Sequence, residues 1–182
     1  MILQVKNIHM ERIEIIDNFL PEDIFYPLQN LMESNTFPWY FQDSYLYDLE
    51  NTSHDNYQFT HSFFGKVWVE SMGETESYSP YNELLIPILD KFKVKKLEKV
   101  KANLNPRTST HIEGGYHTDM ENVTTSILYM NTNNGWTEIQ GSGKIDCVEN
   151  RAVTFNSNLM HSGYTCTEQK RKIVINFNYG KN

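Results

Sequence analysis

Two histidines and one aspartate are the side chains of this sequence best suited to hold a metal ion. His117 and Asp119 form a His-x-Asp pair within the run GGYHTD, residues 114–119. On a β-strand, side chains two residues apart point to the same side, roughly 6.5–7 Å apart along the chain, so both can reach one ion. His161, at the start of a later β-type run, is the best third ligand. Two imidazoles and one carboxylate leave three positions of a metal open, as expected for non-haem iron(II) oxygenases.

A cation beyond His161 suggests an anion-binding group beside this metal. In residues 171–179 the odd-numbered positions Arg, Ile, Ile, Phe and Tyr share one face of a strand, so Arg171 is predicted to point inward. A buried charge needs a partner. 2-Oxoglutarate would chelate iron through its C1 carboxylate and C2 keto oxygen, and the guanidinium of Arg171 can bind its C5 carboxylate with two parallel hydrogen bonds.

The neighbours of Arg171 are predicted to face away from this site. By the same alternation Lys170 and Lys172 point the other way, and Asn176 and Asn178 lie on an outer face, where they are solvated or pair with a neighbouring loop.

A second strand is predicted to contribute to the pocket for the co-substrate. Thr125, Ile127 and Tyr129 share one face of the run 123–131. The hydroxyl of Tyr129 can donate a hydrogen bond to the same C5 carboxylate, with Ile127 beside it.

Other polar and aromatic residues compete for places in the site. His111 and Glu113 precede the His-x-Asp pair closely and are alternative ligands, or else belong to a loop at the mouth of the site. Arg107 is a candidate for contact with substrate or co-substrate. Trp136 either lines the site or is a buried or rim aromatic residue.

Helical signals occupy the first half of the chain. Pro21 followed by two acids predicts a helix start, and apolar residues then recur at helical spacing, with Pro27 predicting a kink or a later start. A second helix is predicted from Ser79 and Pro80. Residues 37–66, rich in aromatic and small polar residues, predict loops and short strands that can form a lid over a substrate.

The second half of the chain reads as strands. Short β-type runs separated by turn residues predict a sandwich or barrel. These runs are residues 97–105, 123–131, 136–140, 144–148, 151–156, 161–167 and 171–179.

Length and composition restrict the class of protein. The chain has 182 residues, 39% of them hydrophobic, and a net charge of −7, which fits one globular domain and argues against nonspecific nucleic-acid binding. No apolar run is long enough for a membrane helix, and no signal peptide is evident. Two cysteines without metal-type spacing, Cys147 and Cys166, suit a reducing cytoplasm, where we expect the protein.

Several motifs in their order and spacing resemble the catalytic core of Fe(II)/2-oxoglutarate dioxygenases, in the prolyl 4-hydroxylase-like branch. They are HTD (117–119), ILYMN (127–131), NGWTE (134–138), RAVTF (151–155), HSG (161–163) and RKIVI (171–175). The runs KANLNPR (101–107) and INFNY (175–179) are most similar to small phage-encoded members. The run DNFLP (17–21) also resembles the entry to the first helix in that branch.

The resemblance implies a double-stranded β-helix, a jelly-roll of the cupin kind, with helices packed outside. Residues 97–182 would form the catalytic core and residues 1–96 the N-terminal helices and lid of the same single domain. It implies His117, Asp119 and His161 as iron ligands, 2-oxoglutarate as co-substrate bound by Arg171 and Tyr129, and ascorbate as an auxiliary reductant. The acidic charge and the aromatic segment 37–66 favour a peptide, protein or small molecule as substrate, and the resemblance implies a peptidyl proline or another protein side chain. We expect a monomer or homodimer in the cytoplasm, that of the host if the chain is phage-encoded.

Two positions bear on the chemistry that the resemblance implies. Prolyl hydroxylase relatives often carry a tyrosine on the strand before the His-x-Asp pair, where this chain has Asn103 and Asn105. Asn103 is therefore a candidate for the oxoglutarate pocket, and proline as substrate is less certain. Halogenating relatives replace the aspartate by a small residue, so Asp119 favours hydroxylation.

Two further functions remain open from the sequence. One is a cupin-like barrel that binds a small ligand or another metal without oxygenating. The other is a structural phage-type protein whose barrel has no activity.

Overall fold

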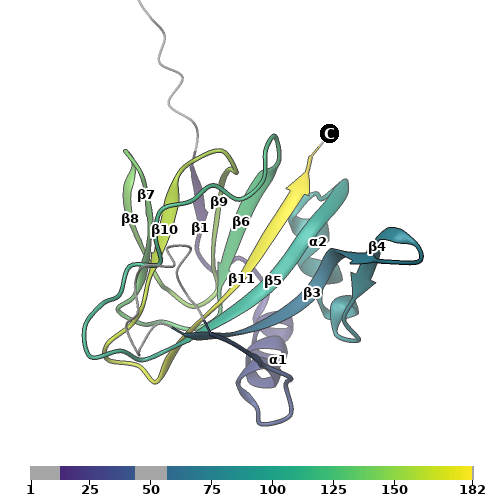
Figure 1. Ribbon diagram of the computed structural model, residues 1–182. Helices are drawn as coiled ribbons and strands as arrows, with labels where there is room; N and C mark the ends of the chain where they lie inside the picture. The colour runs from purple at the N-terminus through teal and green to yellow at the C-terminus, as the bar shows by residue number, and fades with distance from the viewer. Residues whose placement is uncertain (1–12, 44–56, 182) are drawn as a thin grey trace, which may run out of the picture.

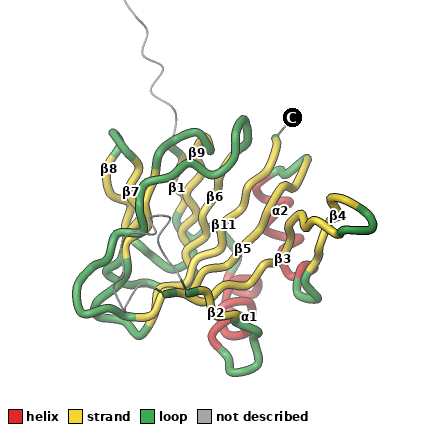
Figure 2. The backbone as a smooth tube through the Cα atoms, in the orientation of Figure 1, coloured by secondary structure: helices red, strands yellow, loops and turns green. Residues whose placement is uncertain are grey.

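The computed structural model describes residues 13–43 and 57–181, and β-strands are the predominant secondary structure of this part of the chain (Figures 1 and 2). In chain order the elements are β1 (Glu14–Ile16), α1 (Glu22–Glu33), β2 (Tyr40–Gln42), β3 (Gln58–Val69), β4 (Gly73–Tyr78), the 3₁₀ turn η1 (Asn82–Leu85), α2 (Ile86–Phe92), β5 (Lys96–Pro106), β6 (Thr124–Tyr129), β7 (Trp136–Ile139), β8 (Gly143–Asp146), β9 (Arg151–Asn156), β10 (His161–Tyr164) and β11 (Arg171–Gly180).

These strands form two antiparallel sheets of unequal size. The large sheet has the order β1-β9-β6-β11-β5-β3-β2, with β4 paired to β3, and the small sheet has the order β10-β7-β8. Figure 1 shows the small sheet at the left, the helices against β11, β5 and β3, and the β3–β4 hairpin projecting at the right. The expected mainly-β fold with flanking helices is confirmed.

Each β-type run predicted in the second half corresponds to one of the strands β5 to β11. The expectation for residues 37–66 was partly wrong, because residues 58–69 form the long strand β3, whose first half pairs with β5 and whose second half pairs with β4. The register of the pairing with β5 shifts between Ser62 and Phe64, and such a bulge breaks the two-residue alternation by which a strand is recognised. The remainder of the predicted lid, residues 44–56, lies outside the described residues.

Local sequence explains where α1 begins and which face it buries. Pro21 precedes the first turn, which carries Glu22 and an aspartate at the positive end of the helix dipole. Phe25, Leu28 and Met32 recur at helical spacing and are buried. Pro27 neither ends the helix nor delays its start: it lies inside α1, on the exposed face, and the helix continues to Glu33.

The second helix begins later than the sequence predicts. Residues 82–85 form the 3₁₀ turn η1, and α2 follows with Pro87 in its first turn, where the missing proline N–H costs no hydrogen bond. It ends at Lys93, which adopts a left-handed conformation with φ 58°. No helix in residues 13–43 and 57–181 is long and apolar enough to cross a membrane.

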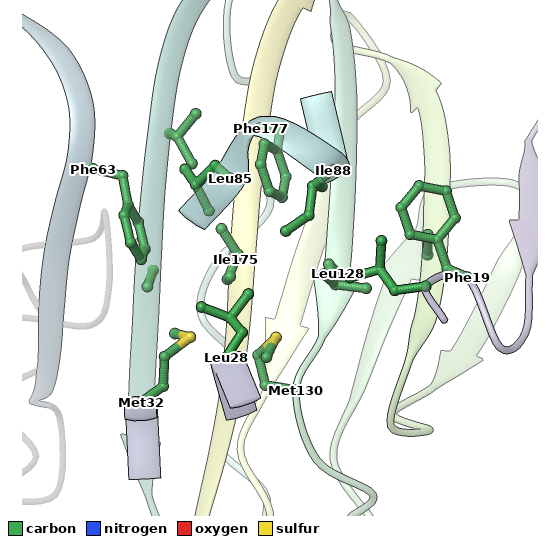
Figure 3. Packing of buried hydrophobic residues seen from close by; sticks show 14 of the residues in the cluster. Phe19, Leu28, Met32, Phe63, Leu85, Ile88, Leu128, Met130, Ile175 and Phe177 are labelled. Carbon is green, nitrogen blue, oxygen red and sulfur yellow. The ribbon is translucent and has the colours of Figure 1, made fainter. Parts of the chain in front are cut away.

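The helices and one face of the large sheet enclose the main hydrophobic core. Leu28 and Met32 of α1 and Ile88 of α2 point at Ile175 and Phe177 of β11 (Figure 3). The opposite face of the same sheet packs against the small sheet through a second cluster. Its fully or nearly fully buried members are Ile127, Tyr129, Ile139, Ile145, Cys147, Val153, Phe155 and Val174. The central strand β11 is therefore covered on both faces.

Truncation of a side chain in the main core should destabilise the whole fold. We expect Ile175→Ala to lower the free energy of unfolding by about 2–5 kcal/mol, because Ile175 is fully buried and its loss leaves a cavity. Urea denaturation followed by circular dichroism measures this change. Ile15→Ala, on the half-exposed edge strand β1, is the matched control and should cost only about 0.5 kcal/mol. Equal losses for both variants would contradict this assignment of the core.

Candidate metal centre

Strand pairing brings the three predicted metal ligands together. The amide of His117 donates to the carbonyl of His161 at 3.0 Å, and the amide of His161 donates back to His117 at 2.9 Å. The amide of Asp119 donates to the carbonyl of Ser157 at 3.2 Å. Residues 113–119 thus run antiparallel beside β10, and the two histidines face each other across this pair.

The ligand atoms are close enough to share one ion. Nε2 of His117 lies 3.9 Å from Oδ1 of Asp119, and Nε2 of His161 lies 3.8 Å from Oδ2 of Asp119. All three ligand atoms lie within 4.8 Å of one another, and this is the one such group of three His, Cys, Asp or Glu residues found within the described residues. The prediction that His117, Asp119 and His161 come together is confirmed.

Backbone carbonyls fix the orientation of both imidazoles. Nδ1 of His117 lies 3.1 Å from the carbonyl of Gly115, and Nδ1 of His161 lies 3.0 Å from the carbonyl of Leu159. A carbonyl oxygen can only accept, so Nδ1 carries the proton in each ring. In the neutral rings this tautomer leaves the Nε2 lone pairs directed toward Asp119, as a metal ligand requires.

The carboxylate of Asp119 is held from one side. Its Oδ2 accepts a hydrogen bond from the Thr125 hydroxyl at 2.6 Å and another from Nδ2 of Asn178 at 3.0 Å. Nδ2 of Asn178 also donates to the Thr125 hydroxyl at 3.0 Å. Because both donors reach Oδ2, they fix the plane of the carboxylate and leave Oδ1 turned toward His117.

The surroundings of His117 favour its neutral form. Burial lowers the pKa of His117, and the nearby imidazole of His161 and the ammonium of Lys99 lower it further, against the opposing effects of Gly115 and Asp119. A neutral imidazole is the form that binds metal.

The triad opens onto a polar cavity of about 110 Å³ between the two sheets. The face of β5 and β11 that lines it carries lysine and asparagine at most positions. Besides the triad, the residues that line the cavity include Lys99, Lys101, Asn103, Asn105, Ile127, Thr137, Lys172, Val174, Asn176 and Asn178.

The predicted orientation of Arg171 was wrong. Arg171 lies on the helix side of β11, where its Nη2 is 3.4 Å from Oε2 of Glu33 in α1, and a third of its side chain is exposed to solvent. The apolar face that it shares with Ile173 and Ile175 does point into a core, but this is the core beneath the helices and not the interior of the jelly-roll.

Lys172 occupies the place that the sequence assigned to Arg171. Only 3% of Lys172 is exposed, and its Nζ donates to the carbonyls of Trp136 at 2.8 Å and Tyr164 at 2.9 Å. Burial lowers the pKa of Lys172. No carboxylate of the described residues pairs with this ammonium, which also hydrogen-bonds the buried thiol of Cys147 and lines the cavity. A buried cation of this kind calls for an anion from outside the chain.

The other predicted co-substrate residues lie at or behind the cavity wall. Ile127 and Asn103 line it, and the buried Oδ1 of Asn103 has no hydrogen-bond partner within residues 13–43 and 57–181. Tyr129 is fully buried and donates to the Thr137 hydroxyl at 2.8 Å. Thr137 lines the cavity, so Tyr129 supports it from behind and leaves the Thr137 hydroxyl proton available to a ligand.

The asparagines of β11 also lie where the sequence did not place them. Asn176 and Asn178 line the cavity, and Asn178 is buried against Asp119. The prediction of an outer face was wrong because the small sheet covers that face, but the alternative of pairing with a neighbouring loop holds for Asn178, which donates to Asp119. One signal in the sequence was available, namely that the polar residues 172, 176 and 178 share one face of a strand whose opposite face is apolar after Arg171.

The competing ligand candidates are engaged elsewhere. Nδ1 of His111 bonds the carbonyl of Thr165 at 2.7 Å, and Glu113 accepts from the Tyr164 hydroxyl at 2.6 Å. Trp136 stacks on Tyr164 with ring centroids 4.3 Å apart, and Arg107 is exposed to solvent. None of these four residues lines the cavity.

Solved structures with the same fold include several oxygenases. A 2OG-Fe(II) oxygenase family oxidoreductase from Burkholderia pseudomallei aligns over 93% of this chain and 85% of its own, with TM-score 0.66 and 10% identity. A Pseudomonas putida prolyl-4-hydroxylase aligns over 95% of both chains, with TM-score 0.52 and 10% identity. A Trichoplax adhaerens prolyl hydroxylase, in complex with a hypoxia inducible factor oxygen degradation domain peptide fragment, aligns over 94% and 85%, with TM-score 0.56 and 15% identity.

At these identities the likeness establishes the fold. No protein-family model matches the chain, and no curated protein matches it by sequence. The expected jelly-roll core is confirmed, and the chain shares its fold with 2-oxoglutarate–iron(II) oxygenases over almost its whole length.

Removal of the hydroxyl that holds Asp119 should weaken metal binding without unfolding the protein. We expect Thr125→Val to raise the Kd for Mn(II), a redox-inactive stand-in for iron(II), by about 10- to 100-fold, because the carboxylate loses one of two donors that orient it. Calorimetric titration measures this affinity.

Ser126→Ala is the matched control for this prediction. Ser126 lies on the opposite face of β6, bonded to Tyr179 at 2.9 Å, so the change removes a buried hydroxyl from the same strand. Its Mn(II) affinity should stay within about twofold of the parent, since Ser126 touches no ligand. Parental affinity in Thr125→Val would refute the role given to Thr125.

Proposed function

We propose that this protein is an iron(II)- and 2-oxoglutarate-dependent dioxygenase that hydroxylates a carbon of its substrate. The observation that carries the proposal is the pairing, in one cavity, of a two-histidine, one-aspartate cluster with Lys172, a buried cation that has no carboxylate partner within residues 13–43 and 57–181. The cluster alone would suit several metals. The addition of a buried ammonium suits a ligand that both chelates the metal and carries a distant carboxylate, as 2-oxoglutarate does.

The donor set fits iron(II) on the chemistry of its residues. His117, Asp119 and His161 would hold the ion, with backbone carbonyls and Thr125 fixing the ligands before it arrives. Bound iron(II) supplies activation of O₂, coupled to oxidative decarboxylation of oxoglutarate to succinate and CO₂.

Residues of the cavity wall would position the co-substrate. Lys172 would bind the C5 carboxylate, with the hydroxyl of Thr137 as a second donor and Tyr129 fixing the rotamer of Thr137. Asn103 can turn its amide so that N–H₂ donates to an oxoglutarate oxygen. Val174 and Ile127 supply apolar wall beside them and keep water from the chelated carbons.

A peptide is the first substrate class to test. The Trichoplax adhaerens neighbour is a prolyl hydroxylase in complex with a peptide fragment, and the Pseudomonas putida neighbour is a prolyl-4-hydroxylase. We therefore propose a peptidyl side chain as substrate, with proline as the first residue to examine. Asn103 and Asn105, where prolyl hydroxylases often have tyrosine, make other side chains the next to examine.

Metal and co-substrate binding test the proposal directly. Anaerobic addition of iron(II) and 2-oxoglutarate should produce a weak visible charge-transfer band, which appears only when both chelate one site. Asp119→Ala and His161→Ala should each abolish the band and weaken iron binding at least about 100-fold, since each removes one of three ligands. His111→Ala is the control that keeps the band, because His111 lies outside the cavity. Parental iron affinity in either ligand variant would refute the triad.

Separate replacement of the neighbouring residues Lys172 and Arg171 by methionine distinguishes this proposal from a metal-binding barrel without oxygenase activity. We expect Lys172→Met to raise the Kd of 2-oxoglutarate at least about 100-fold, because the C5 carboxylate loses its buried partner. Methionine fills the same space without a charge, so the fold should persist.

Arg171→Met is the matched control on the adjacent position of β11. It breaks a partly exposed ion pair with Glu33, and 2-oxoglutarate affinity should change by less than about threefold. Calorimetry with Mn(II)-loaded protein measures both variants. An unchanged affinity in Lys172→Met would contradict oxoglutarate as the ligand and favour the non-catalytic barrel.

A further inference from the structure

Two lysines that neither the metal nor the co-substrate uses face the cavity. Lys99 and Lys101 occupy alternate positions of β5 and line the cavity together. In the pairing with β11, Lys99 lies opposite Asn178 and Lys101 opposite Asn176. Because Asn178 donates to Asp119, these lysines lie at the metal end of the cavity, and Lys172, opposite Asn105, lies toward the other end.

These two ammonium groups have no acidic partner within residues 13–43 and 57–181, apart from the distant influence of Asp119. Lys99 is exposed to solvent and Lys101 is partly buried, and the one side-chain hydrogen bond of the Lys101 Nζ in this part of the chain goes to the neutral Oε1 of Gln42 at 3.5 Å. Burial lowers the pKa of Lys101 and the charge of Lys99 lowers it further, while Asp119 raises it. The two lysines therefore repel each other. The carboxylate that stabilises the charged form of Lys101 is that of Asp119, the proposed metal ligand.

Lysines near the other face of the same strand, outside the cavity, are paired with an acidic residue. Glu98 pairs with Lys96 at 2.5 Å and with Lys66 at 3.5 Å. The chain has 23 acidic residues and a net charge of −7, so acids are not scarce. Against this background a cavity lined by three lysines and one aspartate is a local reversal of charge.

Loading of the site would not neutralise Lys99 and Lys101. The carboxylate of Asp119 and the C1 carboxylate of oxoglutarate together match the charge of iron(II), and the C5 carboxylate matches Lys172. The two lysines of β5 are then the remaining uncompensated charges of the cavity lining. Their position beside the metal is where the substrate must place its reacting carbon.

We propose, resting on the proposed function, that the substrate carries a carboxylate or phosphate group close to the carbon that is hydroxylated, and that Lys99 and Lys101 bind this anion. The paired ammonium groups would hold one compact anion between them, with the amide of Asn176 as a further donor from β11. A long polyanion such as a nucleic acid fits less well, since the acidic protein surface would repel its other phosphates.

The test compares acidic and neutral ligands that otherwise match. The protein is loaded with Mn(II) and 2-oxoglutarate, and calorimetry measures binding of three pairs. They are the capped peptides Ala-Pro-Glu-Ala and Ala-Pro-Gln-Ala, free N-acetylglutamate and N-acetylglutamine, and the capped peptide Ala-Pro-Ser-Ala with and without a phosphate on its serine. The pairs distinguish a peptide-borne carboxylate, a free carboxylate and a phosphate.

We expect at least one acidic member to bind at least tenfold more tightly than its neutral partner. In the double variant Lys99→Gln/Lys101→Gln this preference should fall below threefold. The double variant Lys95→Gln/Lys170→Gln removes the same charge from exposed positions outside the cavity and should keep the preference. Succinate release with iron(II) and O₂ should follow the same order of ligands.

Two results would overturn the inference. One is the absence of a tenfold preference in all three pairs, and the other is a preference that survives in Lys99→Gln/Lys101→Gln. Failure of the proposed function is recognised separately, because Mn(II) and 2-oxoglutarate would then fail to bind in the first titration, before any substrate probe is added.

Discussion

The site depends on the burial of β11 on both faces. One face packs under α1 and α2 and is apolar from Ile173 onward, while the other faces the small sheet and carries Lys172, Asn176 and Asn178. A strand that is solvated on one side can place polar residues there without partners. A strand covered on both sides cannot, so each polar group on its inner face must bond another group of the protein or a ligand. Asn178 bonds a group of the protein, the carboxylate of Asp119. Lys172 bonds backbone carbonyls and is the residue that we propose binds a ligand.

The sequence predicted the strands of the second half and the metal ligands because both leave local signals. Alternation marks a strand, and His-x-Asp puts two ligands on one side of it. The same alternation led to the wrong cation, since it separates the two faces of β11 without telling which face meets the helices. Arg171 was assigned to the site because its face is apolar, whereas the site face is the polar one.

Other features could not be read from the sequence because they arise from long-range pairing. The strand β3 lies beside β5 in space and is interrupted by a bulge, so its residues alternate poorly. The support of Asp119 by Asn178 joins residues 59 positions apart in the chain. The cluster of Lys99 and Lys101 with the triad likewise requires the register between β5 and β11.

The mutual backbone hydrogen bonds of His117 and His161 have a consequence for folding as well as for chemistry. An ion held by both rings would act as a cross-link that closes the chain between them, reinforcing the two isolated bridges between residues 113–119 and β10. Metal binding and the folding of this edge of the small sheet would then be thermodynamically coupled. Loss of the ion would loosen the edge, and fraying of the edge would release the ion.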